Sequence, residues 1–561
     1  MTPNPDAFIN DRPADPEMTI PEKSARPLKA CIIIPPVFDF YATPHRFSGL
    51  GAAIVSNCLK AGGCSVQVLD FPMQRKKGAP IPLPAVLRFL NPHLMAQEEG
   101  KLSFFTRYQR FGPLMSDCAD QIIKTSPDMV FIACFAFCYA EAALEIAARI
   151  RAINPNLPII AGGAGVSAYP EFFIRDPHVD FAFIGEAEVT IPGFLQAFRS
   201  DDRDFRTVPN LYQKTDGRVT PPVNKKQTTA QEIAFVLKKT GETKKAIYVT
   251  TALSRGCPKT CRFCSNFLCH GRKFRVIPAD TVRNALAEMP LPADTGKTVT
   301  INFEDDNLLL APDYFLEIMD IFRTRFSGFA GVSFLAENGV DHTQLTPELT
   351  KILIQNGMRQ FNLSIASTHA PILQEEQRNS EFSLYESALK TIHEHGVPCI
   401  TYFICGFKKD TPETVVANII YLAKLPTRIG ISLFYPVPGI PDYTDTRLFD
   451  RVPPSLCASS SAFPWNGSLT TGQMITAFRL ARLVNLLKSG TQSDLEKEVI
   501  SRIFKHRRLY TMVKTGGVVD IIPVPGMDQE MVGLLVEGMF SCEYPYLAAS
   551  SFSNVQKSVT R

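Results

Sequence analysis

The chain has 561 residues, of which 45% are hydrophobic and 20% are charged, an ordinary balance for a globular protein. A net charge of +4, from 59 basic and 55 acidic residues, gives no reason to expect a nucleic-acid partner. The amino terminus lacks the apolar core of a signal peptide, and no stretch is long and apolar enough to span a membrane. We therefore expect a protein of the cytoplasm.

Residues 1–27 are polar and rich in proline, and we expect them to form a disordered leader. Over residues 28–200, short apolar runs alternate with segments of helical periodicity. This alternation predicts an α/β domain with a doubly wound, Rossmann-like parallel sheet. An aromatic and basic insert at 71–125 interrupts it, and its length is typical of a functional segment or a local cap.

Ligands of a doubly wound sheet bind beyond the carboxyl ends of its strands, and the predicted loops there are rich in glycine. No G-x-G-x-x-G follows the first strand, so the pattern of a dinucleotide site is missing. The sequences GLGAAIVSNCLKAGG, IIAGGAGVSAYPE and FIGEAEVT resemble the cobalamin-binding domain that precedes many radical S-adenosylmethionine (SAM) cores. The resemblance implies cobalamin contacts at Gly162, Gly163, Gly165, Gly185 and Glu186.

The cobalt ligand does not follow from this resemblance. Classical cobalamin domains carry D-x-H-x-x-G, whose histidine binds cobalt, whereas Asp39 and His45 lie six residues apart on the corresponding loop. We therefore interpret His45 as a solvent-facing or hydrogen-bonded histidine. Relatives without the motif hold cobalamin without a protein histidine.

Residues 201–244 form a predicted linker, in which Asp216 and Gly217 between extended runs indicate a hairpin. Strand and helix signals then alternate six times over 245–445. The predicted strands lie near 246–253, 298–304, 330–336, 360–365, 398–405 and 429–435.

A cysteine triplet follows the first of these strands. Cys257, Cys261 and Cys264 are spaced C-x3-C-x2-C, and Phe263 precedes the last cysteine. Thiolates suit iron–sulfur clusters or zinc. Three cysteines on a 4Fe–4S cluster leave one iron open for chemistry. The alternative is a structural zinc site completed by Cys269 or His270, but zinc sites use two separated pairs of ligands, and no second pair follows.

The triplet and the six strand–helix units resemble the radical SAM superfamily. The resemblance implies a partial (β/α)6 TIM-type barrel that carries the triplet on its catalytic face. It also implies that SAM chelates the open iron and is cleaved to a 5′-deoxyadenosyl radical. An electron donor such as flavodoxin or ferredoxin and a small-molecule substrate would complete the reaction.

The resemblance also implies a SAM site built from the strand ends. The acidic patch Glu304–Asp306 corresponds to the group that binds the SAM amino group in relatives, with loop capping as the alternative, and Glu337 with Asn338 is a second candidate. Ala366 replaces the acid usual after the fourth strand. An arginine fork suits the SAM carboxylate. The predicted SAM-binding residues are Phe263, Glu304, Asp305, Asp306, Ser364, Ser367, Arg378 and Gly406.

Residues 446–561 are expected to form a small, mostly helical region, with one helix near 472–488 and the only tryptophan, Trp465, at its entry. Trp465 fits either a core position or a pocket wall. The resemblance as a whole implies a cobalamin-dependent radical SAM methylase of class B that acts on an unactivated carbon of a small-molecule, lipid or natural-product substrate. The alternatives are a cobalamin-dependent radical SAM cyclase or rearrangement enzyme, and a non-catalytic zinc-binding α/β protein.

Overall fold

A computed structural model of the chain describes residues 26–40, 48–75, 77–94, 107–215, 217–290, 296–489 and 527–540. Residues 1–25 of the predicted leader, His45, Asp216 and most of the carboxyl-terminal tail lie outside these residues. The chain forms two compact units. Unit 1 comprises Met1–Ile81, Gln109–Asn338 and Val437–Cys457, and unit 2 comprises Pro82–Tyr108, Gly339–Pro436 and Ala458–Arg561.

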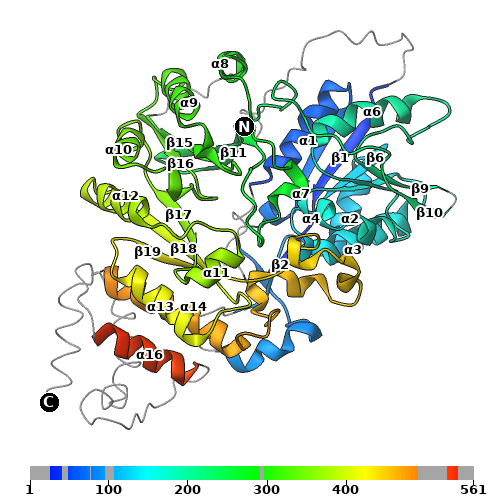
Figure 1. Ribbon diagram of the computed structural model, residues 1–561. Coiled ribbons are helices and arrows are strands. Elements are labelled where there is room, and N and C mark those ends of the chain that lie inside the picture. The colour runs from blue at the N-terminus through cyan, green and yellow to red at the C-terminus, as the bar shows by residue number, and fades with distance from the viewer. Residues whose placement is uncertain are drawn as a thin grey trace. The chain divides into compact units, whose positions relative to one another are not determined.

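A seven-stranded sheet forms the first layer of unit 1 (Figure 1), with the strand order β10-β9-β8-β7-β6-β1-β3. The five strands from β8 to β3 are parallel, which confirms the predicted doubly wound sheet. The hairpin predicted for the linker pairs antiparallel with β8, so it extends this sheet. The strands are β1 (Lys29–Ile34), β3 (Ser65–Asp70), β6 (Met129–Ala133), β7 (Ile159–Gly162), β8 (Phe181–Phe183), β9 (Leu211–Thr215) and β10 (Arg218–Thr220).

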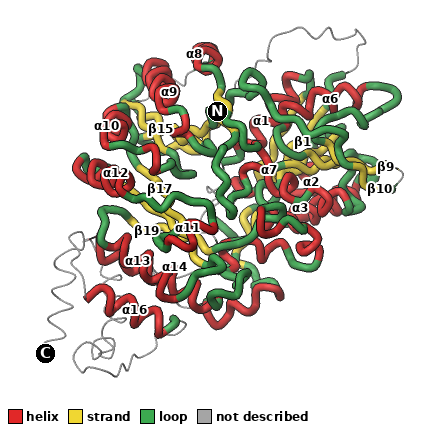
Figure 2. Tube along the Cα trace, viewed as in Figure 1, coloured by secondary structure: helices red, strands yellow, loops and turns green. Residues whose placement is uncertain are grey.

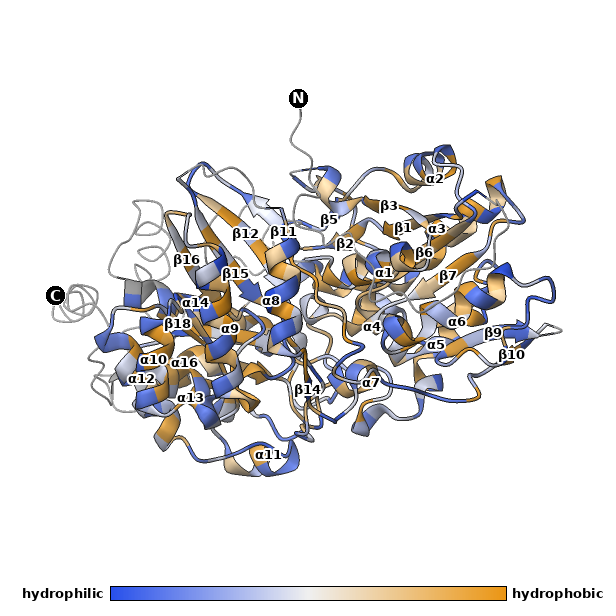
Figure 3. Cartoon of the chain, turned by 90° about the horizontal axis from the view of Figure 1, so that it is seen from above, coloured by the Kyte–Doolittle hydropathy of each residue, from blue (hydrophilic) through white to orange (hydrophobic). Residues whose placement is uncertain are grey.

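Helices cover both faces of this sheet. On one face, Ile32 and Ile34 share a core with residues of α1 (Leu50–Ala61) and α6 (Ala187–Arg199). On the other, the Cys31 thiol is hydrogen-bonded to Thr125 at the end of α2 (Met115–Lys124), which packs on α3 (Ala140–Ile153). Alternate side chains of a strand face opposite sides, so the two helix pairs sandwich the sheet. The inner strands β1, β6 and β7 are accordingly apolar (Figure 3).

The predicted insert at 71–125 does not form one element. Its strand β5 (Gln109–Phe111) lies in unit 1 between β2 (Val37–Asp39) and β4 (Ala79–Pro80) and pairs antiparallel with both. Its last segment is the sheet helix α2. The 3-10 segment η3 (Ala85–His93) belongs instead to unit 2. There the carbonyl of His93 accepts a hydrogen bond from Arg479 of α14 (Thr471–Ser489) at 2.8 Å.

Unit 1 contains a second sheet, in the order β11-β12-β15-β16. Its last three strands are parallel, and buried phenylalanine rings, including Phe303 and Phe315 with centroids 5.1 Å apart, pack beneath it. Short helices α4 (Ala164–Ala168) and α5 (Pro170–Ile174) also lie in unit 1. The elements are β11 (Lys238–Glu242), β12 (Ala246–Thr251), β15 (Thr298–Phe303), β16 (Gly331–Leu335), α8 (Ala279–Glu288) and α9 (Pro312–Arg325).

Unit 2 is built on three parallel strands covered by helices (Figure 2). The six strands predicted for residues 245–445 are therefore all present, three in each unit. Within the described ranges, no helix is both long and apolar enough to cross a membrane. The elements of unit 2 are β17 (Phe361–Ala366), β18 (Cys399–Cys405), β19 (Arg428–Leu433), α10 (Pro347–Gln355), α11 (Ala370–Glu375), α12 (Ser383–Glu394), α13 (Pro412–Ala423), α14 (Thr471–Ser489) and α16 (Gln529–Phe540).

Candidate functional site

The cysteine triplet lies on a closed loop beyond the carboxyl end of β12. Two short strands, β13 (Ser254–Arg255) and β14 (Arg275–Val276), pair antiparallel at the base of this loop. The short helix α7 (Asn266–His270) follows the last cysteine. We call residues 256–274 the cysteine loop. Its position after a parallel strand confirms the placement that the sequence predicted.

Gly256 allows the cysteine loop to close. Its φ is +80°, and an added Cβ would lie 2.3 Å from the carbonyl oxygen of Lys273 on the opposite side of the loop. Only glycine fits such a backbone contact without strain.

We expect Gly256→Ala to destabilise unit 1 by about 3 kcal/mol, because left-handed strain adds to a backbone clash. The iron retained after anaerobic reconstitution should fall in parallel. Gly217→Ala is the matched control, since Gly217 also has a positive φ of +74° but nothing within 4 Å of the added Cβ. Thermal unfolding and iron analysis of both variants measure the effect, and equal losses in both would contradict this account.

Within the loop, Cys261 is buried, whereas Cys257 and Cys264 are partly exposed. The side-chain amide of Asn307 donates to Cys257 Sγ at 3.7 Å. Among the described residues, no three His, Cys, Asp or Glu side chains gather closely enough to hold one metal ion. A 4Fe–4S cluster takes each cysteine on a separate iron. Three soft sulfurs on one loop, with an amide donor beside them, fit such a cluster chemically.

The acidic residues after β15 hold the cysteine loop. Asp305 Oδ1 accepts from the backbone amides of Leu253 and Ser254 at 3.0 and 2.7 Å and from Ser254 Oγ. Asp306 accepts from the amide of Gly256 at 2.8 Å and from the side chain of Asn266 at 3.0 Å. These contacts support the capping alternative for Asp305 and Asp306. A SAM contact remains a prediction for both.

Glu304 has a different environment. Its carboxylate accepts from Thr250 Oγ1 at 2.9 Å and from Ser48 Oγ at 2.8 Å. Burial raises the pKa of Glu304 above its usual value, and these two hydrogen bonds only partly offset it. Burial likewise raises the pKa of Asp305 to about 6, although its hydrogen bonds with Ser254 and Leu253 lower the pKa.

Of the other predicted SAM-binding residues, Phe263 lies on the cysteine loop of unit 1, and the remaining four lie in unit 2. Arg378 donates from Nη2 to the carbonyl of Ser364 on β17 at 2.8 Å, so these two residues lie together. The strand is irregular beside them, because its register with β18 shifts between Ser364 and Ala366, and Ala366 has a φ of +61°. Such bulges recur next to active sites. Ser367 follows directly and accepts from the amide of His369 at 3.1 Å.

Gly406 ends the neighbouring strand β18 with a φ of +109°. Its amide and that of Phe407 donate to the buried Asp410 carboxylate at 2.8 and 2.9 Å. Asn466 donates to the Gly406 carbonyl at 2.9 Å. The backbone at this strand end is therefore fixed on both sides. Nothing in the sequence indicated Asp410 or Asn466, because their partners are backbone groups.

Burial raises the pKa of Asp410 to about 6, so its stabilising contribution is fully present below pH 3.8 and is lost as pH rises through 6. We expect Asp410→Asn, which stays neutral, to gain about 2 kcal/mol of unfolding free energy relative to wild type between pH 4.5 and pH 7. Urea unfolding at both pH values measures this. The exposed Glu394→Gln should show no such change, and a pH-independent difference for Asp410→Asn would contradict the expectation.

The predicted cobalamin glycines lie at the ends of β7 and β8, which are neighbours in the first sheet. Gly163 and Gly165 press against the loop after β6, since an added Cβ would come within 2.6 Å of Cys134 O and 2.7 Å of Ala136 C. Gly162 and Gly185 are less crowded, since an added Cβ would lie 3.7 Å from Phe183 Cβ and 3.5 Å from Cys269 O, respectively. Glycines on adjoining strand ends are compatible with the backbone approach of a large cofactor.

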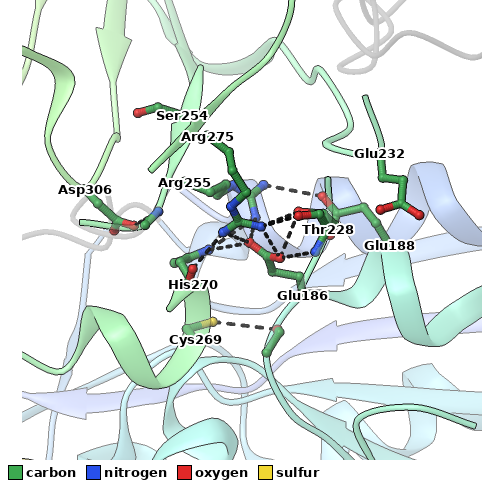
Figure 4. A network of polar contacts seen from close by, with 12 residues as sticks. Glu186, Glu188, Thr228, Glu232, Ser254, Arg255, Cys269, His270, Arg275 and Asp306 are labelled. Carbon is green, nitrogen blue, oxygen red and sulfur yellow. Dashed lines mark hydrogen bonds and ion pairs between the residues drawn. The ribbon is translucent and has the colours of Figure 1, made fainter. Parts of the chain in front are cut away.

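Glu186, the fifth residue predicted at this edge, is bound by other parts of the chain (Figure 4). Arg275 pairs with both carboxylate oxygens, at 2.9 and 3.0 Å, and Thr228 donates its amide and hydroxyl, each at 2.8 Å. His270 Nδ1 lies 3.3 Å away. Burial alone would raise the pKa of Glu186, but the hydrogen bonds from His270 and Arg275 hold it at about 2.

Two family models match the chain. The B12 binding domain model matches residues 109–195, and the radical SAM superfamily model matches residues 251–420. The chain thus carries a B12 binding domain followed by a radical SAM domain. This order confirms the predicted family resemblance, the fold class and, at the level of the two domains, the predicted cofactor classes.

Curated relatives agree with these domains. Bacteriochlorophyllide d C-12(1)-methyltransferase of Chlorobaculum tepidum is 26% identical over 264 residues, which are 46% of this chain and 53% of the relative. An uncharacterized methyltransferase of Pyrococcus horikoshii is 26% identical over 345 residues, 60% of this chain and 71% of the relative. The chain thus spans about half the length of the first relative.

A solved structure has the same fold. The radical SAM methyltransferase TsrM from Kitasatospora setae, with cobalamin and a [4Fe-4S] cluster bound, superimposes with a TM-score of 0.53 and 15% identity. The match covers 74% of this chain and 77% of TsrM.

Proposed function

We propose that this chain is a cobalamin-dependent radical SAM enzyme that methylates an unactivated carbon of a small-molecule, lipid or natural-product substrate. The observation that carries the proposal is the contact, within unit 1, between the cysteine loop and the segment that follows β7. Helix α7 of the cysteine loop packs on α4, which follows the glycines of β7. Cys269 Sγ lies 3.7 Å from the carbonyl oxygen of Gly185.

Each region has its own task in this proposal. Cys257, Cys261 and Cys264 would hold the cluster, and the glycines at the ends of β7 and β8 would hold cobalamin. When bound, cluster and SAM supply a hydrogen-abstracting radical, and cobalamin supplies the methyl group. The protein's own contribution is to keep the two cofactors at a fixed separation and to exclude water.

The SAM contacts complete the proposal. Arg378 would bind the SAM carboxylate through its planar fork. Ser364, Ser367 and Gly406 are proposed to contact the nucleoside. The acidic patch Glu304–Asp306 is proposed to bind the SAM amino group, and Phe263 is a further proposed SAM-binding residue. Flavodoxin or ferredoxin is the proposed electron donor. An oxygen-sensitive cluster requires a reducing compartment, so we propose a cytoplasmic location.

The test is cofactor and product analysis of protein purified anaerobically after expression with cobalamin. We expect about four irons with sulfide and one cobalamin per chain. With SAM and a methyl-accepting substrate, both S-adenosylhomocysteine and 5′-deoxyadenosine should form. Deoxyadenosine without S-adenosylhomocysteine would replace methylation by a radical cyclisation or rearrangement, and zinc without iron or cobalamin would overturn the enzyme assignment.

A further inference from the structure

A buried cluster of five ionisable side chains lies beside the cysteine loop, and the proposed chemistry gives it no role. Glu186 and Glu188 supply the carboxylates, and Arg255, Arg275 and His270 supply the cations (Figure 4). The Glu186 side chain is fully buried, and those of Arg255, Arg275 and Glu188 are 5–7% exposed. Burying this many charges is costly unless they are paired, so their pairing fixes the geometry of the segments that carry them.

These side chains come from three separate parts of the chain. Glu186 and Glu188 lie in the segment matched by the B12 binding domain model. Thr228 lies between the two matched segments, and Arg255, His270 and Arg275 lie in the radical SAM segment. Glu186 is therefore the point at which all three parts meet.

Arg255 and Arg275 face one another in the β13–β14 pair, at the two ends of the cysteine loop. Arg275 donates to the Glu186 carboxylate from both Nη1 and Nη2. It also donates to the backbone carbonyls of Thr228 and His270, each at 2.7 Å. Arg255 lies 4.0 Å from Glu186 and 3.5 Å from Glu188. Both ends of the loop thus contact the Glu186 carboxylate, and Arg255 also contacts Glu188.

Glu186 directly follows Gly185, whose amide donates to Oγ of Ser167 on α4 at 2.9 Å. A shift of Glu186 therefore moves the backbone of the predicted cobalamin edge. The carboxylate itself has both oxygens engaged by Arg275, Thr228 and His270. Its contacts are those of a residue that fixes backbone positions.

We propose that Glu186 is a positioning residue that, through Arg275 and Thr228, holds the cysteine loop in register with the cobalamin-binding edge of the first sheet. The catalytic part of this inference rests on the proposed function. Transfer between two bound cofactors depends on their alignment, and a displacement of about 1 Å can cost a factor of about 100. Binding of each cofactor by itself needs only its own loop.

The first test compares wild type, Glu186→Gln and Glu145→Gln, each loaded with cluster and cobalamin. Glu145→Gln is the control, because it removes an exposed carboxylate that pairs with Arg149 in the same sheet domain. We expect Glu186→Gln to retain cobalamin and iron and to cleave SAM reductively within about threefold of wild type. Methyl transfer from SAM to chemically reduced cobalamin, followed by absorbance, should fall at least about tenfold.

A second readout needs no cofactor. Lys226 is held by Asn210 through two hydrogen bonds of 2.8 Å, and Thr228 is held by Glu186. In the full-length apoprotein, Glu186→Gln should therefore accelerate tryptic cleavage after Lys225 or Lys226 at least about fivefold, since proteases act on locally opened segments. Thr228→Val, which removes one hydroxyl from the network, should change both readouts in the same direction if Glu186→Gln fails to fold.

The outcomes separate this inference from the proposed function. Wild type that binds no cobalamin would refute the proposed function, whereas accelerated proteolysis of Glu186→Gln would still support the positioning role. Unchanged methyl transfer and proteolysis in both variants would overturn the inference. Loss of cobalamin binding in Glu186→Gln with unchanged proteolysis would overturn it too, because Glu186 would then be a cofactor ligand.

Discussion

Replacing Cys261 with alanine should reduce the iron bound after anaerobic reconstitution from about four to fewer than one per chain, and should abolish reductive SAM cleavage. Cys261 is the buried member of the triplet, 7% exposed, so no water or buffer thiol can readily replace its sulfur. Iron and sulfide analysis, together with the electron paramagnetic resonance spectrum of the reduced protein, measures the loss.

Cys269→Ala is the matched control for this experiment. Cys269 lies on the same loop, but its thiol is next to Gly185 O and is hydrogen-bonded to Ser167 and His270. A cluster on the triplet predicts that Cys269→Ala keeps its iron. A zinc site completed by Cys269 predicts that both substitutions release the metal equally, and that result would contradict the cluster assignment.

The sequence was sufficient to predict the parallel strands of the first sheet and the six strands of residues 245–445. Runs such as residues 30–34 and 129–133 are continuously apolar, because both faces of a parallel sheet are covered by helices. The cysteine spacing was equally informative, since all three ligands lie within eight residues of one loop. Local patterns of this kind are legible without any knowledge of distant contacts.

The pairing of Glu186 with Arg275 was not predictable in this way. The two residues are 89 positions apart, and neither lies in a sequence pattern that indicates its partner. The sequence pointed to Glu186 only as a neighbour of Gly185. The bulge at Ala366 was hidden for a similar reason, because a left-handed alanine carries no compositional signal. The sequence also suggested a single insert at 71–125, because its aromatic composition does not reveal that η3 and α2 belong to different units.

Substitutions of Asp305 can distinguish a residue that only stabilises the cysteine loop from one that binds SAM. Its Oδ1 accepts three hydrogen bonds from Leu253 and Ser254, where the chain leaves β12 for the cysteine loop. Asp305→Ala leaves those donors without their acceptor, at a cost of about 1–3 kcal/mol for each buried group. We expect the thermal transition of unit 1 to fall by roughly 6–12 °C, which corresponds to about 3 kcal/mol.

Asp305→Asn separates the two roles, because it keeps an accepting oxygen and removes the negative charge. If Asp305 only braces the loop, Asp305→Asn should unfold within about 3 °C of wild type and bind SAM with unchanged affinity, as measured by equilibrium dialysis of the reconstituted protein. If its carboxylate binds the SAM amino group, affinity should fall about tenfold or more while the thermal transition stays. The exposed Asp320→Ala, which removes a surface ion pair with Arg323, should change neither quantity, because such pairs contribute little to stability.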